Sequence, residues 1–136
     1  MPVLLPALAL VAAGCGGSDT LVVPDAVQAA LVTGTTDVVN AIYAYDRETG
    51  YGVPQELVQD GDTVTADDRG GPSGFGVDSP WRGSSTLRWY VGDAPTYSFC
   101  VEDGGFHHEV LDAEKGGGQR TRKETAEGPC GEAPPG

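Results

Sequence analysis

The chain is poor in basic residues. It has 8 lysines and arginines against 20 aspartates and glutamates, so its 136 residues carry a formal net charge of −12. A surface with this balance repels the phosphate backbone of nucleic acids. No nucleic-acid partner is therefore expected. A chain of this length is expected to fold as one domain with a modest core.

The sequence also lacks the residue patterns of common active sites and metal sites. Its two histidines, His107 and His108, are adjacent, and adjacent residues of a strand project to opposite faces, so they cannot share one metal ion in regular strand geometry. A Gly-x-Ser-x-Gly nucleophile pattern is missing. The acidic residues at 60–62 and 67–68 lack the alternating ligands and the closing glutamate of a calcium loop. We expect no catalysis, no cofactor and no resident metal.

A short apolar segment begins the chain. It has about 13 residues, fewer than the roughly 20 that a helix needs to cross a bilayer core, but enough for the hydrophobic region of an export signal. It ends in small and apolar residues: Val11, Ala12, Ala13, Gly14 and Cys15. This ending resembles the lipobox of bacterial lipoproteins. The alternative interpretation is a buried apolar N-terminal segment with a free thiol.

The lipobox resemblance implies cleavage between Gly14 and Cys15 and a diacylglyceryl thioether on the Cys15 sulfur. Two acyl chains, each methylene contributing about 0.8 kcal/mol, hold a protein stably on a membrane. We therefore expect residues 1–14 to be a signal peptide and residues 15–24 a flexible tether. The expected location is the bacterial cell membrane, with the protein lipid-anchored and facing the extracytoplasmic side.

The chain has three cysteines. With Cys15 assigned to the lipid, Cys100 and Cys130 remain as an even pair in a compartment that permits disulfides. We predict a bond between them, which stabilises the fold by about 3 to 4 kcal/mol on the chain-entropy model. The alternative is one buried thiol and one thiol in a disordered segment.

One long helix is predicted near the N-terminus, over residues 25–47. Pro24 and Asp25 suit a helix start, and Gly50 suits a left-handed stop. Gly34 is a poor helix former at which a helix can kink or divide, but the apolar stripe keeps its phase across it, so one helix is predicted. The apolar residues form one helical stripe, made of Val27, Leu31, Val38, Ile42 and Tyr45 and widened by Ala30, Val39 and Tyr43.

After the helix the apolar pattern becomes alternating. Residues 86–91 and 96–101 predict a hairpin, and residues 106–111 predict a third strand of a meander. Residues 62–65 and 76–78 are weaker strand candidates. Residues 116–136 show no apolar periodicity and are expected to form a loop held through the second cysteine of the pair, followed by a free tail.

The two tryptophans have different expected places. Trp89 alternates in phase with Leu87 and Val91, so we assign it to the core. Trp81 lies in a Pro- and Gly-containing stretch and is the better candidate for exposed recognition of a carbohydrate or a peptide. Even for Trp81, the interpretation that we favour is a loop that folds back onto the sheet.

The order of these features resembles the heads of type IV pilins and pseudopilins: a long helix, an antiparallel meander, and a late-strand cysteine joined to one near the C-terminus. Residues 37–51 are similar to the end of a pilin helix with its Gly-Tyr turn. Residues 97–101, followed by 104–106, are similar to the strand that carries the first pilin cysteine. The resemblance covers residues 26 to about 115. The N-terminal segment departs from it, because assembling pilins keep a longer apolar helix with a glutamate near its start.

The sequence thus predicts an α+β fold, with one long N-terminal helix packed on a small antiparallel β-meander of three to four strands, pilin-like. Residues 25–115 form the head. The resemblances imply a non-enzymatic, lipid-anchored protein whose head has a structural or protein-binding role at the cell surface. Its expected partners are the membrane, through the lipid, and a cell-envelope or pilus-type protein. The alternative is a small-ligand or metal-binding lipoprotein.

Overall fold

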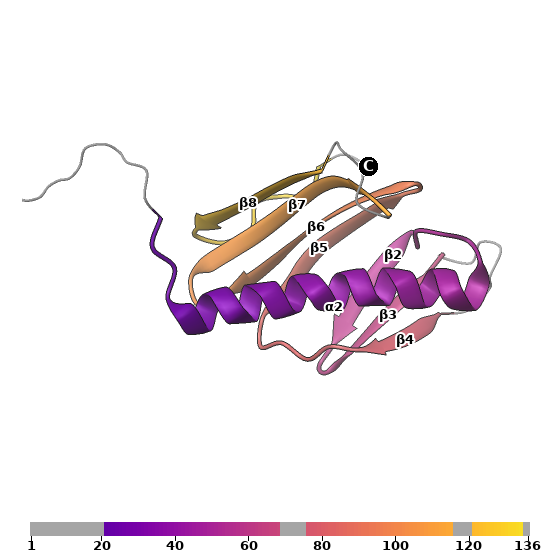
Figure 1. The fold of residues 1–136 in the computed structure, drawn as a ribbon, viewed down its shortest axis with the longest axis horizontal. Coiled ribbons are helices and arrows are strands. Elements are labelled where there is room, and N and C mark those ends of the chain that lie inside the picture. The colour runs from indigo at the N-terminus through magenta and orange to yellow at the C-terminus, as the bar shows by residue number, and fades with distance from the viewer. Residues whose placement is uncertain (1–20, 69–75, 116–120, 135–136) are drawn as a thin grey trace, which may run out of the picture.

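The computed structural model describes residues 21–68, 76–115 and 121–134, and this part of the chain forms one helix and two antiparallel sheets (Figure 1). The helix is α2 (Asp25–Thr49). The smaller sheet contains β2 (Glu56–Asp60), β3 (Thr63–Asp67) and β4 (Val77–Pro80), in that order. The larger sheet contains β5 (Thr86–Asp93), β6 (Thr96–Asp103), β7 (Phe106–Glu114) and β8 (Arg122–Glu127), also in chain order. The α+β class is as predicted, and the larger sheet is a four-stranded meander.

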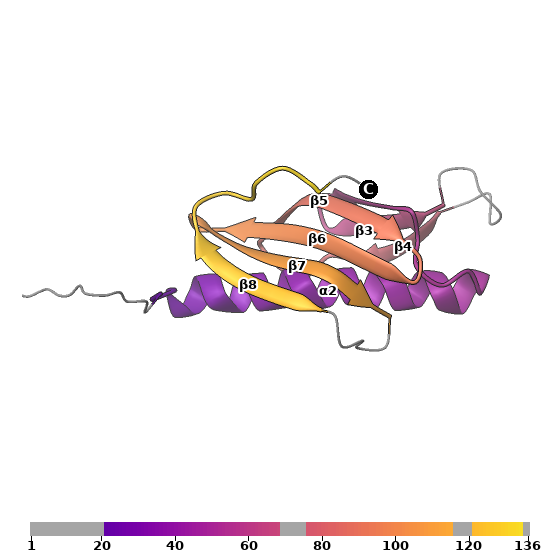
Figure 2. The ribbon, with the colours of Figure 1, turned by 90° about the horizontal axis from the view of Figure 1, so that it is seen from above.

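Helix α2 packs against both sheets. The larger sheet lies over the helix, with its strands running obliquely to the helix axis, and the smaller sheet lies beside the C-terminal half of the helix (Figures 1 and 2). The prediction of a single small meander is therefore incomplete. The smaller sheet is built from segments between the helix and the hairpin, where apolar alternation is short.

The ends of α2 follow the sequence signals. Asp25 occupies the first turn, where a negative charge suits the positive end of the helix. Gly50 ends the helix in the left-handed conformation with φ 75°, and its N–H donates to the Asp46 carbonyl at 2.7 Å. The predicted stop at Gly50 is confirmed.

Gly34 does not divide α2, which is continuous through it. A Cβ atom at position 34 would overlap the Ser85 Oγ and touch the ring of Trp81. The glycine therefore permits a close approach between the helix and the connection from β4 to β5. The sequence pattern revealed the glycine but not the segment that packs on it.

The buried face of α2 is shifted relative to the predicted stripe. Tyr43 is 42% exposed and Val39 is half-buried, so both lie at the margin of the buried face. Asp37 and Ala41, which the stripe omitted, are buried. The reason is the second packing surface: the helix contacts the smaller sheet and the loop after it as well as the meander. The buried helix residues are Ala30, Leu31, Gly34, Asp37, Val38, Ala41, Ile42 and Tyr45.

Strand β5 contains a bulge that reverses the phase of its side chains. Leu87 is opposite Val101, but Trp89 is opposite Cys100. The extra residue moves Tyr90 to the face that packs against the core. Trp89 lies half-buried on the other face, so its assignment to the core was wrong.

The hairpin of β5 and β6 and the third strand β7 confirm the predicted meander, and β3 and β4 correspond to the two weaker candidates. Strand β8 is the main difference, because residues 116–136 were expected to form a loop and a tail. It pairs with β7 from Phe106↔Glu127 to Leu111↔Arg122. Its six residues are mostly polar, and backbone pairing at a sheet edge requires no apolar alternation.

The core lies between α2 and the two sheets. Its largest fully buried side chains include Tyr45, Phe99, Leu31 and Ile42. Within the described ranges, no helix combines the length and apolar character needed to cross a membrane. The predicted signal peptide at residues 1–14 and the lipidation site, Gly14 and Cys15, lie outside those ranges.

Candidate functional site

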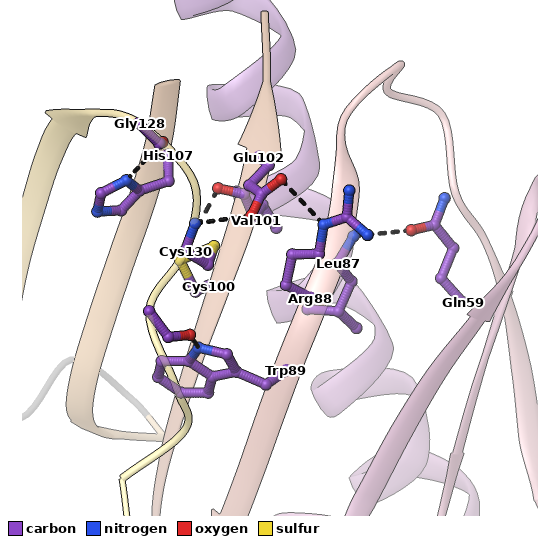
Figure 3. A network of polar contacts seen from close by, with 11 residues as sticks. Gln59, Leu87, Arg88, Trp89, Cys100, Val101, Glu102, His107, Gly128 and Cys130 are labelled. Carbon is purple, nitrogen blue, oxygen red and sulfur yellow. Dashed lines mark hydrogen bonds and ion pairs between the residues drawn. A yellow bond between two sulfur atoms is a disulfide. The ribbon is translucent and has the colours of Figure 1, made fainter. Parts of the chain in front are cut away.

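The outer face of the larger sheet, which points away from α2, carries the predicted disulfide. Cys100 on β6 is bonded to Cys130, with their Cα atoms 6.1 Å apart. The bond holds the segment that follows β8, residues 128–134, against this face (Figure 3). The prediction of a Cys100–Cys130 disulfide is confirmed.

A carboxylate next to the disulfide joins three parts of the chain. Glu102 on β6 accepts a hydrogen bond from Arg88 Nε on β5 at 2.9 Å and one from the Cys130 backbone N–H at 2.7 Å (Figure 3). The Glu102 side chain is 18% exposed, whereas that of Arg88 is 54% exposed. The carboxylate therefore links two strands of the sheet to the C-terminal segment.

Two more side chains hold the same segment. His107 on β7 donates from Nδ1 to the Gly128 carbonyl at 2.9 Å, and Trp89 on β5 donates from Nε1 to the Gly131 carbonyl at 3.0 Å (Figure 3). We call Arg88, Trp89, Glu102, His107 and the disulfide the outer-face network. It fixes residues 128–131 from three adjacent strands. Apart from the disulfide, no sequence pattern predicted this network, because its contacts depend on the β5 bulge and on β8.

The environment of Glu102 changes its acidity. Burial raises the pKa of this carboxyl group, but the hydrogen bonds from Cys130 and Arg88 and the nearby charges of Arg88 and His107 together outweigh it and lower the pKa below its ordinary value of 4.5. The carboxylate form is therefore favoured in the folded protein. Its contribution to stability is present above pH 4.5 and is lost as the pH falls through the lowered pKa.

The variant Glu102→Gln tests this contribution. We expect it to lower the free energy of unfolding at pH 7 by about 1 to 2 kcal/mol, since hydrogen bonds to a charged group are lost or weakened. Below the lowered pKa the two proteins should become equal in stability, because the wild-type side chain is then also neutral. Urea denaturation at a series of pH values measures the difference in unfolding free energy at pH 7 and its disappearance in acid. A difference that persists unchanged into acid would contradict the assignment, and Glu124→Gln on the exposed edge is the matched control.

A cavity of about 330 Å³ lies beside the outer-face network, at the end of the sheet where β6 turns into β7. It is lined by Ser84, Thr86, Arg88, Glu102, Asp103, Gly104, Gly105, Phe106, Gly128 and Pro129. Its chemical groups are a guanidinium, two carboxylates and two hydroxyls. Arg88 uses Nε for Glu102, which leaves the two Nη groups as donors toward a carboxylate or carbonyl of a partner. Ser84 donates to Asp103 at 3.4 Å, and no histidine lies among the lining residues to act as its base. The cavity thus suits polar recognition.

Trp81, the sequence candidate for exposed recognition, is buried with 3% of its surface exposed. Its Nε1 donates to the Ser85 carbonyl at 3.0 Å, and its backbone N–H donates to the Asp62 carbonyl at 2.8 Å. The loop has folded back, as favoured from the sequence. Trp81 fills the space between helix and sheets and offers no platform to a ligand.

Asp37 explains why this loop folds back. Its Oδ2 accepts hydrogen bonds from the backbone N–H groups of Arg82 at 2.7 Å and Gly83 at 3.0 Å, and the residue is 1% exposed. A buried carboxylate on the helix therefore binds the loop that carries Trp81. The sequence feature that could have indicated this contact is an acidic residue next to Val38 of the apolar stripe, because a charge buried there needs a hydrogen-bonding partner.

The two histidines point to opposite sides of β7, as predicted. His107 belongs to the outer face, whereas His108 faces α2 and its Nδ1 is hydrogen-bonded to Thr125 Oγ1 at 2.8 Å. Burial, followed by the charges of Lys123 and His107, lowers the pKa of His108, so it is neutral at pH 7. Across residues 21–68, 76–115 and 121–134, no group of three or more His, Cys, Asp or Glu side chains is arranged to hold a metal ion.

The chain matches no protein-family model, no curated protein and no solved structure.

Proposed function

We propose that the protein is a lipid-anchored, non-enzymatic protein on the extracytoplasmic side of a bacterial membrane, with a pilin-like head that makes structural or protein-binding contacts at the cell surface. The observation that carries the proposal is the Cys100–Cys130 disulfide. Such bonds form and persist in oxidising compartments outside the cytoplasm. This supports an exported protein, in agreement with the lipobox-like ending at Cys15.

The arrangement of the head supports the pilin-like part of the proposal. A long N-terminal helix packs on an antiparallel meander, and a disulfide from the second strand of that meander holds the C-terminal segment. The smaller sheet, β2 to β4, is inserted between the helix and the meander. In this proposal the lipid on Cys15 replaces the polymerising apolar helix of pilins, so the head acts at the membrane without joining a filament.

The surface beside the outer-face network supports a binding role. It is open and carries charged and hydroxyl groups, and a disulfide and hydrogen bonds from three strands hold one of its walls. A carboxylate or backbone carbonyl of a protein partner fits the exposed guanidinium of Arg88. The same cavity of about 330 Å³ favours the second candidate function, a small-ligand-binding lipoprotein, because its volume lies in the range of ligand sites.

Lipid labelling tests the anchoring proposal. Cells that express the full chain are grown with radioactive palmitate, and the wild-type protein is expected to carry label and to sediment with membranes. Cys15→Ala should lose the label and leave the membrane fraction. Cys130→Ala is the matched control, since it removes another cysteine and should remain labelled. An unlabelled wild-type protein, or label retained in Cys15→Ala, would refute the anchor.

A further inference from the structure

The two edges of the larger sheet differ in how they are covered. At the β5 edge, the Leu87 N–H donates to Gln59 Oε1 at 2.9 Å, and Tyr90 donates from its hydroxyl to the Pro54 carbonyl at 2.8 Å. At the other edge, β8 pairs with β7, and within the described ranges no strand pairs with its outer side. The figure from above shows β8 along the rim of the sheet (Figure 2). An uncovered edge strand is a template for another strand.

The backbone of β8 determines which groups this edge presents. The Gly128 N–H donates to the Gly105 carbonyl at 2.7 Å, one step beyond the pair Phe106↔Glu127. Gly128 is thus turned toward the β7 side, and in an antiparallel pair alternate residues direct both N–H and C=O to the same side. The backbone N–H and C=O groups of Lys123, Thr125 and Glu127 therefore point to the open edge.

The side chains of the same three residues share one face of the sheet. Lys123 is opposite Val110, Thr125 is opposite His108, and Glu127 is opposite Phe106. Val110 is buried in the core, so this is the face toward α2. The order along the edge is thus positive, neutral, negative, with equal spacing.

This order is complementary to itself. When two such edges run antiparallel with Thr125 opposite Thr125 of a second copy, Lys123 of each copy is opposite Glu127 of the other. The backbone groups that point outward then meet in the hydrogen-bonded positions of the new pair. Opposite charges directly across an antiparallel pair stabilise it, whereas like charges destabilise it.

The net charge of the molecule also favours association of two copies through the β8 edge. The net charge of −12 makes most of the surface repel a second copy. Strand β8 is an exception, because Arg122 and Lys123 balance Glu124 and Glu127. A second copy therefore meets the least repulsion where the backbone edge is open.

We propose that β8 is a self-pairing edge, through which two copies of the chain form a symmetric dimer with a continuous eight-stranded sheet centred on Thr125. The closed two-fold arrangement uses the same residues of both copies and leaves no open β8 edge. The outer-face network lies on the opposite face of the sheet from Lys123 and Glu127, so both copies keep it accessible. The inference does not depend on lipid at Cys15, since it uses only residues of the sheet.

Charge reversal tests the pairing on the full chain. Native mass spectrometry of the purified protein is expected to show two copies of the chain, each 14.0 kDa when all 136 residues are retained and smaller after cleavage at Cys15, apart from any lipid mass. Lys123→Glu places two glutamates opposite each other twice per dimer, and should raise the dissociation constant about tenfold to a hundredfold. The double variant Lys123→Glu with Glu127→Lys restores both opposite-charge pairs and should restore the dimer.

Arg122→Glu is the matched control. It makes the same change of charge one residue away, but its side chain is on the other face and Gly128 of the second copy is opposite it in the proposed register. It should leave most of the dimer intact. Far-UV circular dichroism shows that each variant is folded. A monomeric wild-type protein, an equal loss in Arg122→Glu and Lys123→Glu, or no recovery in the folded double variant would each overturn the proposal.

Discussion

Replacing Asp37 by alanine is expected to lower the free energy of unfolding by about 3 kcal/mol or more. The carboxylate is buried and accepts two backbone N–H groups, from Arg82 and Gly83. Hydrogen bonds to a charged group contribute about 1.5 to 3 kcal/mol each, and removal of the acceptor leaves two buried donors without a partner. Because the loop then loses its attachment to α2, Trp81 should also become more exposed. Chemical denaturation measures the first effect, and iodide quenching of tryptophan fluorescence measures the second.

Two variants separate this effect from a general weakening of the helix. Asn40→Ala lies three residues further along α2 at an exposed position, and should change stability by less than about 0.5 kcal/mol. Asp37→Asn keeps one acceptor oxygen of the same shape and should fall between wild type and alanine. An Asp37→Ala protein as stable as the Asn40→Ala protein would show that the buried carboxylate does not hold the loop.

Removing the disulfide is the second large change. The double variant Cys100→Ala with Cys130→Ala is expected to lose about 3 to 4 kcal/mol, because the unfolded chain is no longer restricted by the covalent loop. The sequence separation of the two cysteines is 30 residues. The effect should appear in the midpoint of urea denaturation. A midpoint equal to that of the wild type would contradict it.

The same variant has an optical signature. Trp89 is hydrogen-bonded to Gly131 in the segment that the disulfide holds, so release of the segment should expose the indole and shift its emission to longer wavelength. Trp81 stays in the core while the protein remains folded. Trp89→Phe in the disulfide-free background is the control and should abolish the shift. A shift that survives this substitution would have to come from Trp81, and would mean that the core itself has opened.

The sequence pattern was sufficient to predict the elements whose apolar residues follow a single regular spacing, either helical or alternating. The apolar stripe and Gly50 predicted α2, and simple alternation predicted β6 as a buried strand with Tyr97, Phe99 and Val101 in the core. Each of these residues packs against one neighbouring layer, so its spacing along the chain was enough to predict its burial. The disulfide followed from a parity argument over three cysteines, without knowledge of the fold.

The remaining features depend on contacts between distant segments. One extra residue in β5 exchanged the faces of Trp89 and Tyr90, and a bulge has no signature in alternation alone. The role of Asp37 requires a loop more than forty positions away. Strand β8 is held by the edge of β7, so its own side chains carry little information about pairing. The outer-face network combines the bulge with β8, and for this reason the candidate site was missed.

The position of the disulfide also determines how the domain carries tension. When the chain is pulled at its C-terminal end, the force passes from Cys130 directly to Cys100 in β6, an interior strand of the sheet. The hairpin of β7 and β8 lies within the covalent ring and is bypassed by the load. Peeling of the edge strand, which is the weakest mechanical mode of a sheet, is thereby prevented. A head tethered at its N-terminus and gripped at its C-terminus would instead resist by shearing β6 against its neighbours.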